Sequence, residues 1–143
     1  MGMVTIRDYI DADYDDVRHN LVEGGLFHPH WDSRESLQAK ILYAPSSILV
    51  AEDKGRAVGN VYLVIDLWKS EIFRLAVRYS HRNQGIGQEL MKTAEAKLQS
   101  LGVRTVGIWV RNTDQGLLTY YGKQNYKPAT LTHTSMIKDL GSK

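Results

Sequence analysis

Residues 75–102 read LAVRYSHRNQGIGQELMKTAEAKLQSLG, and the apolar pattern changes within this stretch. It opens on an apolar run typical of a strand, whereas after Gly85 apolar residues recur every three or four positions, as on one face of a helix. Arg82, Gly85 and Gly87 lie at the junction. Glycines let a ligand approach the backbone closely, and the first turn of a helix offers unpaired N–H groups and a partial positive charge. The junction therefore predicts an anion site, and a phosphate is the obvious ligand.

The same reading extends to the rest of the chain. The pattern predicts a strand over 4–7, a helix over 11–23 that ends at Gly24-Gly25, and a second helix capped by Ser33 that stops near Pro45. Alternation with period two predicts a hairpin over 47–52 and 57–65 and a third strand over 71–77. The helix after Gly85 has Gly102 as its C-terminal cap, and a strand over 105–110, a helix over 114–124 and a closing strand over 130–137 follow.

This order of elements places an antiparallel meander before a single strand–helix–strand crossover. Such an order is typical of a mixed α/β (α+β) fold. The 143 residues suffice for one hydrophobic core, so we expect a single domain over 1–143.

Composition excludes several classes of function. The chain is 43% hydrophobic and 24% charged, the balance of a folded protein, and its net charge is only +2 without a basic stripe, so no nucleic-acid partner is expected. It contains no cysteine, which excludes disulfides, thiolate zinc sites and a cysteine nucleophile. No apolar run approaches the about 18 residues that span a bilayer, and no signal-peptide core is present, so we expect a cytoplasmic protein without a membrane partner.

Two common phosphate-binding motifs do not fit the junction. A P-loop ends in Gly-Lys-Ser/Thr, but Gln88 and Glu89 follow Gly87. A dinucleotide fingerprint needs a small residue at the position of Leu90 and an acid about 20 residues onward, but no Asp or Glu lies between Glu95 and Asp114.

The segment closely resembles motif A of the GNAT N-acetyltransferases, whose signature is Arg/Gln-x-x-Gly-x-Gly/Ala after a strand with an apolar-x-Val ending. Arg82, Gly85 and Gly87 carry it here, behind Leu75-Ala76-Val77. The later segment NTDQGLLTYYGKQNYKP resembles the family's Asn, Tyr and Gly-Phe elements, at Asn112, Tyr121 and Asn125-Tyr126. The resemblance covers essentially the whole chain and implies the GNAT fold, a mixed and mostly antiparallel sheet with a splayed central parallel pair and flanking helices.

The chain departs from the family pattern at several positions. Tyr79 stands where the family often has Pro, Asn83 where it often has Gly, and Asn125 replaces the Gly before the aromatic residue. An apparent two-residue insertion follows Asn112. Two compatible interpretations of Asn112 remain open, a contact to the cofactor and a helix N-cap with Gln115 three residues on.

The resemblance implies acetyl-CoA as co-substrate and no metal. The backbone N–H groups of Gln84 to Gln88 would surround the pyrophosphate, Arg82 would add a positive charge, and the strand end would pair with the pantetheine arm. The residues expected to bind the cofactor are Leu75, Ala76, Val77, Arg82, Asn83, Gln84, Gly85, Ile86, Gly87, Gln88, Asn112 and Tyr121.

Acyl transfer to an amine needs a base for the ammonium proton, support for the oxyanion and a proton donor for the thiolate. Glu71, six residues before Val77, is the first candidate for the base, as in histone-type members of the family; a solvated edge charge is the alternative. A backbone N–H near Val77 could stabilise the oxyanion. In the family the acid is a tyrosine five residues before the final aromatic residue. Counting back five residues from Tyr126 predicts Tyr121 as the acid and Tyr120 as a core residue.

The loop between the first two helices contains His28, His30 and Trp31, and in the family this region shapes the acceptor pocket. The histidines could bind an acidic group or relay a proton, and Trp31 could line the pocket; a solvated surface loop is the alternative. The sequence therefore predicts acetyl transfer from acetyl-CoA to a primary amine of a small molecule, peptide or protein. The alternatives are a non-catalytic acyl-CoA-binding or sensing module and a dinucleotide-dependent oxidoreductase. The acceptor's identity and a homodimer are left open.

Overall fold

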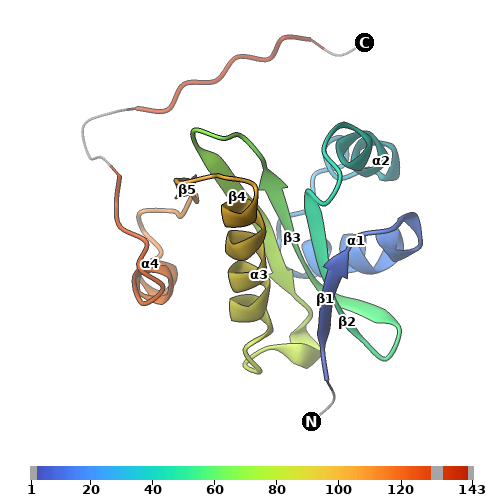
Figure 1. The fold of residues 1–143 in the computed structure, drawn as a ribbon. Helices are drawn as coiled ribbons and strands as arrows, with labels where there is room; N and C mark the ends of the chain where they lie inside the picture. The colour runs from blue at the N-terminus through green and yellow to red at the C-terminus, as the bar shows by residue number, and fades with distance from the viewer. Residues whose placement is uncertain (1–2, 130–133, 142–143) are drawn as a thin grey trace. The chain divides into compact units, whose positions relative to one another are not determined.

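The computed structural model describes residues 3–129 and 134–141, in two compact units that divide after Trp109. The first unit contains a five-stranded sheet and three α-helices (Figure 1). Its elements are β1 (Thr5–Asp8), α1 (Tyr14–Glu23), α2 (Arg34–Tyr43), β2 (Ile48–Asp53), β3 (Arg56–Val64), β4 (Ser70–Val77), α3 (Ile86–Ser100) and β5 (Val106–Gly107). Two short 3-10 helices, η1 (Asp11–Asp13) and η2 (Tyr79–His81), precede α1 and α3.

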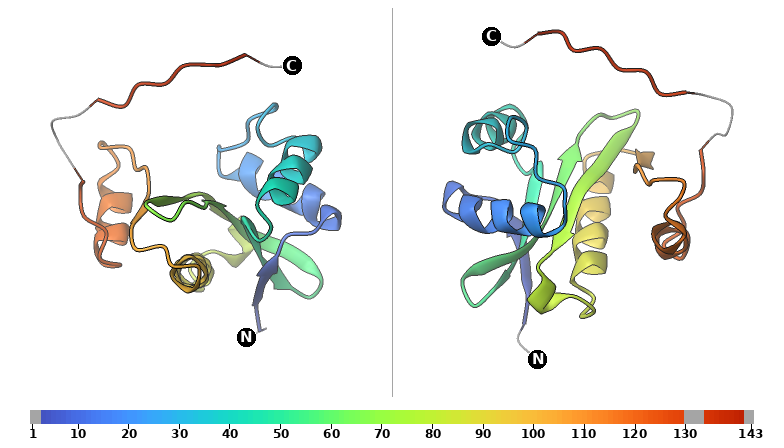
Figure 2. Two further views of the ribbon diagram at one scale, coloured as in Figure 1. Left: turned by 45° about the horizontal axis from the view of Figure 1, so that its top comes forward. Right: turned by 180° about the vertical axis from the view of Figure 1, so that it is seen from behind.

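The strands lie in the order β1-β2-β3-β4-β5. The first four are antiparallel neighbours, and β5 runs parallel to β4 after the crossover through α3. Helices α1 and α2 lie on one face of the sheet and α3 on the other (Figure 2). This arrangement confirms the mixed α/β sheet with flanking helices that the sequence predicts.

Each face of the sheet has its own packing. On the α1 and α2 face the core contains Val17, Leu21, Leu37 and Tyr62, all nearly inaccessible to solvent. On the other face α3 packs closely on Gly59, where an added Cβ would lie 3.1 Å from a methyl carbon of Leu90. The close packing of α3 fixes the position of its first turn, which begins at Ile86, after β4 and the short helix η2.

Local signals in the sequence mark most helix ends correctly. Ser33 caps α2, its hydroxyl accepting a 3.2 Å hydrogen bond from the N–H of Ser36. Gly25, just after α1, and Gly102, just after α3, have φ angles of +71° and +92°. Glycine adopts these left-handed conformations without the penalty that a Cβ brings.

The middle of β4 contains a β-bulge. Asn60 pairs with Ala76 and Tyr62 with Phe73, so two residues of β4, Arg74 and Leu75, lie opposite one residue of β3. Arg74 has a φ of +55°, which is unusual for a residue with a side chain. A bulge bends the strand that contains it. Accordingly β5 pairs with β4 only at Ser70 and Glu71, and the strand predicted over 105–110 is shorter than expected.

The second unit begins at Val110 and contains α4 (Gln115–Gly122). Its N-cap is Asp114, whose Oδ1 accepts a 3.0 Å hydrogen bond from the N–H of Leu117, so the prediction of Asn112 as the cap is wrong. A carboxylate two residues closer to the helix takes that role. Of the closing strand predicted over 130–137, residues 134–137 are not in a strand, and residues 130–133 lie outside the described residues.

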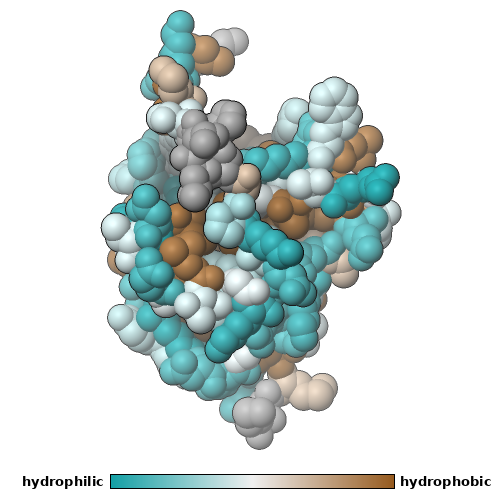
Figure 3. Space-filling model, turned by 90° about the vertical axis from the view of Figure 1, so that its left-hand side faces the viewer, coloured by the Kyte–Doolittle hydropathy of each residue, from teal (hydrophilic) through white to brown (hydrophobic). Residues whose placement is uncertain are grey.

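The surface in Figure 3 is mostly hydrophilic, with smaller hydrophobic areas between the polar side chains. Trp31 and Trp109 are among the large hydrophobic residues that are exposed, 64% and 69% respectively. Within the described ranges, no helix combines the length and the apolar character that crossing a membrane requires.

Candidate active site

The start of α3 presents a run of backbone N–H groups without partners. In the part of the chain that the structure describes, the first hydrogen bond of α3 is from Glu89 N to Gly85 O, and residues 83–88 donate no backbone hydrogen bond. Gly85 and Asn83 adopt left-handed conformations, with φ of +81° and +61°. A left-handed residue next to a helical one, as Gly85 is next to Ile86, turns successive N–H groups toward one point, the arrangement of an anion nest. The predicted phosphate site would use these N–H donors.

The left-handed backbone also explains two departures from the family pattern. Asn83 and Asn125 stand where the family often has glycine, and their φ angles are +61° and +71°. Asparagine is the residue with a side chain that best tolerates this conformation. Both substitutions therefore keep the backbone shape that a glycine would give.

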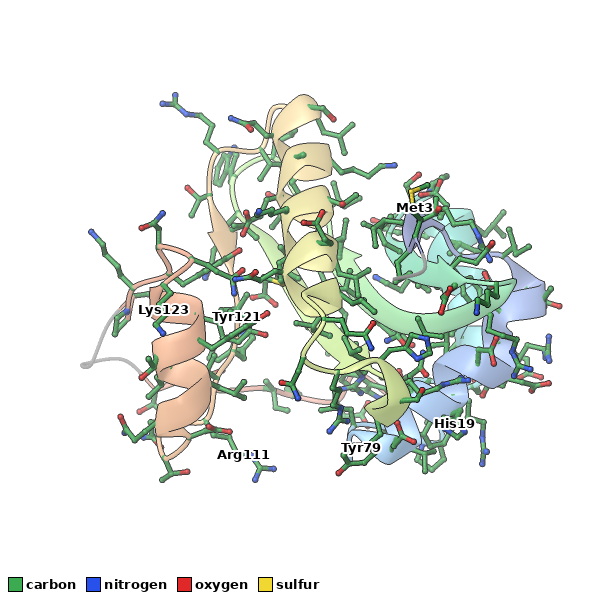
Figure 4. All side chains as sticks on the ribbon, turned by 90° about the horizontal axis from the view of Figure 1, so that it is seen from below. Met3, His19, Tyr79, Arg111, Tyr121 and Lys123 are labelled. Carbon is green, nitrogen blue, oxygen red and sulfur yellow. The ribbon has the colours of Figure 1, made fainter. Side chains whose placement is uncertain are left out.

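Arg82 connects the N–H run to the end of β4. Its Nε donates a 2.8 Å hydrogen bond to the carbonyl oxygen of Val77, and its guanidinium lies 3.8 Å from the ring centroid of Tyr79. The N–H of Tyr79 in turn donates to Glu23 Oε1 at 2.6 Å, which together with a hydrogen bond from His19 holds the pKa of Glu23 below its usual value. Figure 4 shows His19 and Tyr79 near the N-terminal end of α3.

The end of β4 has an edge without a strand partner. Arg78 N donates to Val58 O at 2.8 Å, across β3. Successive residues of a strand point their N–H and C=O groups to opposite sides, so Val77 directs its own pair away from β3. In the described residues β5 pairs only with Ser70 and Glu71, so the N–H of Val77 faces an open edge. An extended ligand could pair there as an additional strand.

Glu71 lies at the point where β4 and β5 begin to separate. Its backbone pairs with Val64 on one side and Gly107 on the other. Its Oε1 accepts a 3.3 Å hydrogen bond from the indole N–H of Trp109. Glu71 and Phe73 are two residues apart on one strand and therefore point to the same face of the sheet, the one covered by α1 and α2.

The three residues predicted in the loop before α2 have different positions. His28 Nδ1 accepts hydrogen bonds from the N–H groups of His30 and Trp31, both at 3.2 Å, so His28 holds the loop in shape. His30 and Trp31 contribute to the wall of a cavity of about 290 Å³ between this loop, α2, β3 and β4. We call it the α2 cavity; its lining residues are His30, Trp31, Asp32, Ser36, Lys40, Tyr62, Phe73 and Arg74.

Sequence reasoning missed most of this lining. Asp32 is 1% exposed and forms an ion pair with Arg74, with 3.2 Å between Oδ2 and Nη2. Lys40 donates a 2.7 Å hydrogen bond from Nζ to Leu63 O, and burial lowers the pKa of its ammonium group. A signal for Arg74 was present, because a charged residue between Phe73 and Leu75 is unusual in an otherwise apolar strand.

A buried network of hydrogen bonds holds the bulge in place. The side-chain amide of Asn60 donates to Arg74 O at 2.9 Å, and that of Asn20 donates to Asn60 Oδ1 at 3.1 Å. Arg78 Nε donates to Asn20 Oδ1 at 3.0 Å. Asn20 and Asn60 are both fully buried, so these bonds hold the left-handed backbone of Arg74 in a place without competing water.

The second unit contains the tyrosines. The ring of Tyr121 makes edge contacts with the rings of Tyr120 and Tyr126, with centroids 5.0 Å and 5.9 Å apart. Burial raises the pKa of Tyr121 to about 12. Figure 4 shows the Tyr121 side chain projecting from α4. Asn112 precedes this helix, and its carbonyl oxygen accepts a 3.4 Å hydrogen bond from the Gln115 side chain.

The chain is similar in sequence and in fold to known acetyltransferases. An acetyltransferase of Sodalis glossinidius is 26% identical over 122 residues, which cover 85% of this chain and 86% of the relative. Two solved structures share the fold at 20% identity, Ard1 from Thermoplasma volcanium (TM-score 0.75, covering 85% of this chain and 80% of that one) and a PaiA N-acetyltransferase from Thermoplasma acidophilum in complex with coenzyme A (TM-score 0.73, 85% and 88%). The family model of the acetyltransferase (GNAT) family matches residues 9–126, and the chain therefore belongs to this family.

Proposed function

We propose that residues 1–143 form one acetyltransferase domain that transfers an acetyl group from acetyl-CoA directly to a primary amine. The observation that carries this proposal is the run of unpaired N–H groups at residues 83–88, next to the open edge of β4 at Val77. The N–H run can bind the diphosphate of acetyl-CoA, and the open strand edge can pair with its peptide-like pantetheine arm. The coenzyme A bound to the PaiA relative supports the same ligand.

The residues that would hold the cofactor follow from these features. The N–H groups of Gln84, Gly85, Ile86, Gly87 and Gln88 would receive the phosphates, with Asn83 shaping the turn and Arg82 adding positive charge. The backbone of Leu75, Ala76 and Val77 would pair with the pantetheine arm. Asn112 and Tyr121 are the further residues that would contact acetyl-CoA, as the resemblance to the family implies. Acetyl-CoA supplies the activated acetyl group when bound.

Three groups of the chain would perform the chemistry. Glu71 would accept the proton of the incoming ammonium group, directly or through a water molecule. The N–H of Val77 would donate to the carbonyl oxygen of the acetyl group, where negative charge develops. Tyr121 would donate to the departing thiolate. It would act as the general acid, transferring its phenolic proton to the thiolate sulfur, and the resulting phenolate would regain a proton from water. Burial raises the pKa of Tyr121 to about 12, so the phenol carries the proton to be donated throughout the working pH range.

The test combines turnover with binding. The protein is incubated with acetyl-CoA and a panel of amines while free thiol is measured, and its thermal unfolding is followed with CoA or NAD. We expect amine-dependent thiol release and stabilisation by CoA alone, because a ligand that binds only the native state stabilises it by mass action. Stabilisation by CoA without turnover would favour a binding module. Stabilisation by NAD instead would favour an oxidoreductase.

A further inference from the structure

The α2 cavity has an unusual balance of charge. Its only carboxylate among the described lining residues, Asp32, is already saturated with donors. Oδ1 accepts from Tyr62 OH at 3.1 Å and from Arg74 Nε at 3.3 Å, and Oδ2 accepts from His28 N at 2.8 Å and pairs with Arg74 Nη2 at 3.2 Å. Asp32 and Arg74 therefore neutralise each other, and the described lining residues offer no free carboxylate to a cationic ligand.

Lys40 adds a positive charge to which no described carboxylate is paired. No ion pair of Lys40 occurs among the residues that the structure describes; its Nζ donates to Leu63 O and lies 5.9 Å and 5.4 Å from the ring centroids of Tyr62 and Phe73. A carbonyl oxygen and two ring faces supply partial negative charge but no counter-ion. Burial lowers the pKa of this ammonium group, and an anion beside it would favour its charged form again.

The cavity also has apolar walls and a small volume. Trp31, Tyr62 and Phe73 line it, and its volume of about 290 Å³ is at the lower end of the range of small-molecule sites. Glu71, the proposed base, points to the same face of β4 as Phe73. An acceptor could therefore direct its amine toward Glu71 and a second group into the cavity.

Resting on the proposed function, we propose that the acceptor is a small amine that also carries an anionic group, a carboxylate or a phosphate, and that Lys40 and Arg74 in the α2 cavity bind this group. The remaining N–H groups of Lys40 and the outer edge of the Arg74 guanidinium are the donors. Polycationic amines fit poorly, because their second charge would meet Lys40 without an available carboxylate.

The experiment compares acceptors that differ only in the group opposite the amine. ω-Amino acids of graded length are assayed beside their amides, the corresponding diamines and ω-aminoalkyl phosphates, with acetyl-CoA and thiol detection. We expect kcat/KM for the anionic acceptors to exceed that for the amides by about tenfold or more, mainly through KM, as loss of a hydrogen-bonded charge pair implies. Comparison of the amino acids with the aminoalkyl phosphates decides which anion is preferred.

Variants of Lys40 test whether the α2 cavity causes this selectivity. Lys40→Met removes the charge and keeps the length, and it should bring the ratio of anionic to amide acceptors close to one. Lys40→Arg keeps the charge and should retain most of the ratio. The control is Lys92→Met, which removes one positive charge from an exposed position on α3, on the other face of the sheet, and should leave the ratio unchanged.

Binding is measured independently of turnover. With CoA present, the anionic acceptors should raise the unfolding temperature of the wild-type protein but not of Lys40→Met. If diamines or amides are acetylated as well as the anionic acceptors, or if neither turnover nor stabilisation distinguishes the anions, the inference about the acceptor is wrong while the proposed function stands. If CoA itself does not stabilise the protein, the proposed function is wrong, and the inference about the acceptor loses its basis.

Discussion

The side chain of Arg82 donates a 2.8 Å hydrogen bond to the carbonyl oxygen of Val77, so the residue that ends β4 is tied to the loop that begins α3. This bond uses the carbonyl group of Val77 on the open edge but leaves its N–H available. It holds the side chain of Arg82, the residue just before the unpaired N–H groups of residues 83–88, against the end of β4. The bond therefore links the two features that the proposed acyl-CoA site would use, the open strand edge and the run of unpaired N–H groups.

Substitution of Gly87 tests whether the N–H groups at residues 83–88 bind a phosphate of CoA. We expect Gly87→Val to weaken CoA binding by about tenfold or more, because its Cβ branches would occupy the space that a phosphate needs beside the N–H groups. Isothermal titration with CoA measures this, and the thermal unfolding of the free protein shows whether folding is kept. Gly116→Val is a matched control, since Gly116 is likewise the second residue of its helix and an added Cβ there meets only Asp114 Oδ1 at 3.6 Å. Equal affinities in the two variants would remove the phosphate assignment.

The Gly87 prediction depends on a segment that the sequence alone identified. The N–H run at residues 83–88 and α3 are continuous stretches of the chain, so the apolar period and the glycines predict them. The α2 cavity is different, because Asp32, Lys40 and Arg74 meet only when the loop, α2 and β4 pack together. The spacing of these three residues in the sequence does not predict that they lie together. The expected strand over 105–110 is longer than β5 for a similar reason, since β5 pairs with β4 only as far as Glu71, before the bulge in β4.

Glu71 tests the base. Without a base on the enzyme, the reaction depends on amine that is already neutral, and this fraction rises about tenfold per pH unit toward a typical amine pKa of about 10.4. Glu71→Gln should therefore lower kcat/KM most at low pH, by about 10²-fold, and make the pH profile steeper than that of the wild type. Rates across pH, with a fixed acceptor, measure this. Glu35→Gln, at an exposed position of α2, is the control. A wild-type profile in Glu71→Gln would transfer the role to a loop histidine or to water.

The ionisation of Asp16 should make the free energy of unfolding depend on pH. Burial pushes the pKa of Asp16 upward, but hydrogen bonds from Arg56, from the N–H of Ala57 and from Arg78 together outweigh it, so its pKa lies below the usual value. A carboxylate with a lowered pKa stabilises the folded state fully above its unfolded pKa of about 3.9, and the stabilisation disappears as pH falls through the folded pKa.

The corresponding variant is Asp16→Asn. The difference in free energy of unfolding between wild type and Asp16→Asn should be constant near neutral pH and shrink below about pH 4, as urea denaturation at several pH values would measure. Asp15→Asn provides the control, because the Asp15 side chain is 91% exposed and its contact with Arg34 is 3.7 Å long. A difference for Asp16→Asn that stays constant down to pH 2 or so would show that the carboxylate's charge contributes nothing to folding.

Tyr121 and Tyr120 test the proton donor. They are adjacent on α4 and therefore point about 100° apart, so only one of them can reach a departing thiolate. Burial raises the pKa of Tyr121 to about 12, and the phenol consequently remains protonated throughout the pH range in which the protein can be assayed. We expect Tyr121→Phe to lower kcat by about 10²-fold with CoA affinity nearly unchanged, and the wild-type rate to show no decline from Tyr121 ionisation at alkaline pH.

Tyr120→Phe is the matched control for the proton donor. Within the described residues the hydroxyl of Tyr120 makes no hydrogen bond, so its removal should change the free energy of unfolding by no more than about 0.5 kcal/mol and leave kcat near the wild-type value. Steady-state kinetics with free-thiol detection and urea denaturation separate the two effects. If Tyr120→Phe is the slow variant, the assignment counted back from Tyr126 is wrong by one residue. If neither variant is slow, the thiolate leaves without help from a tyrosine, and water supplies its proton.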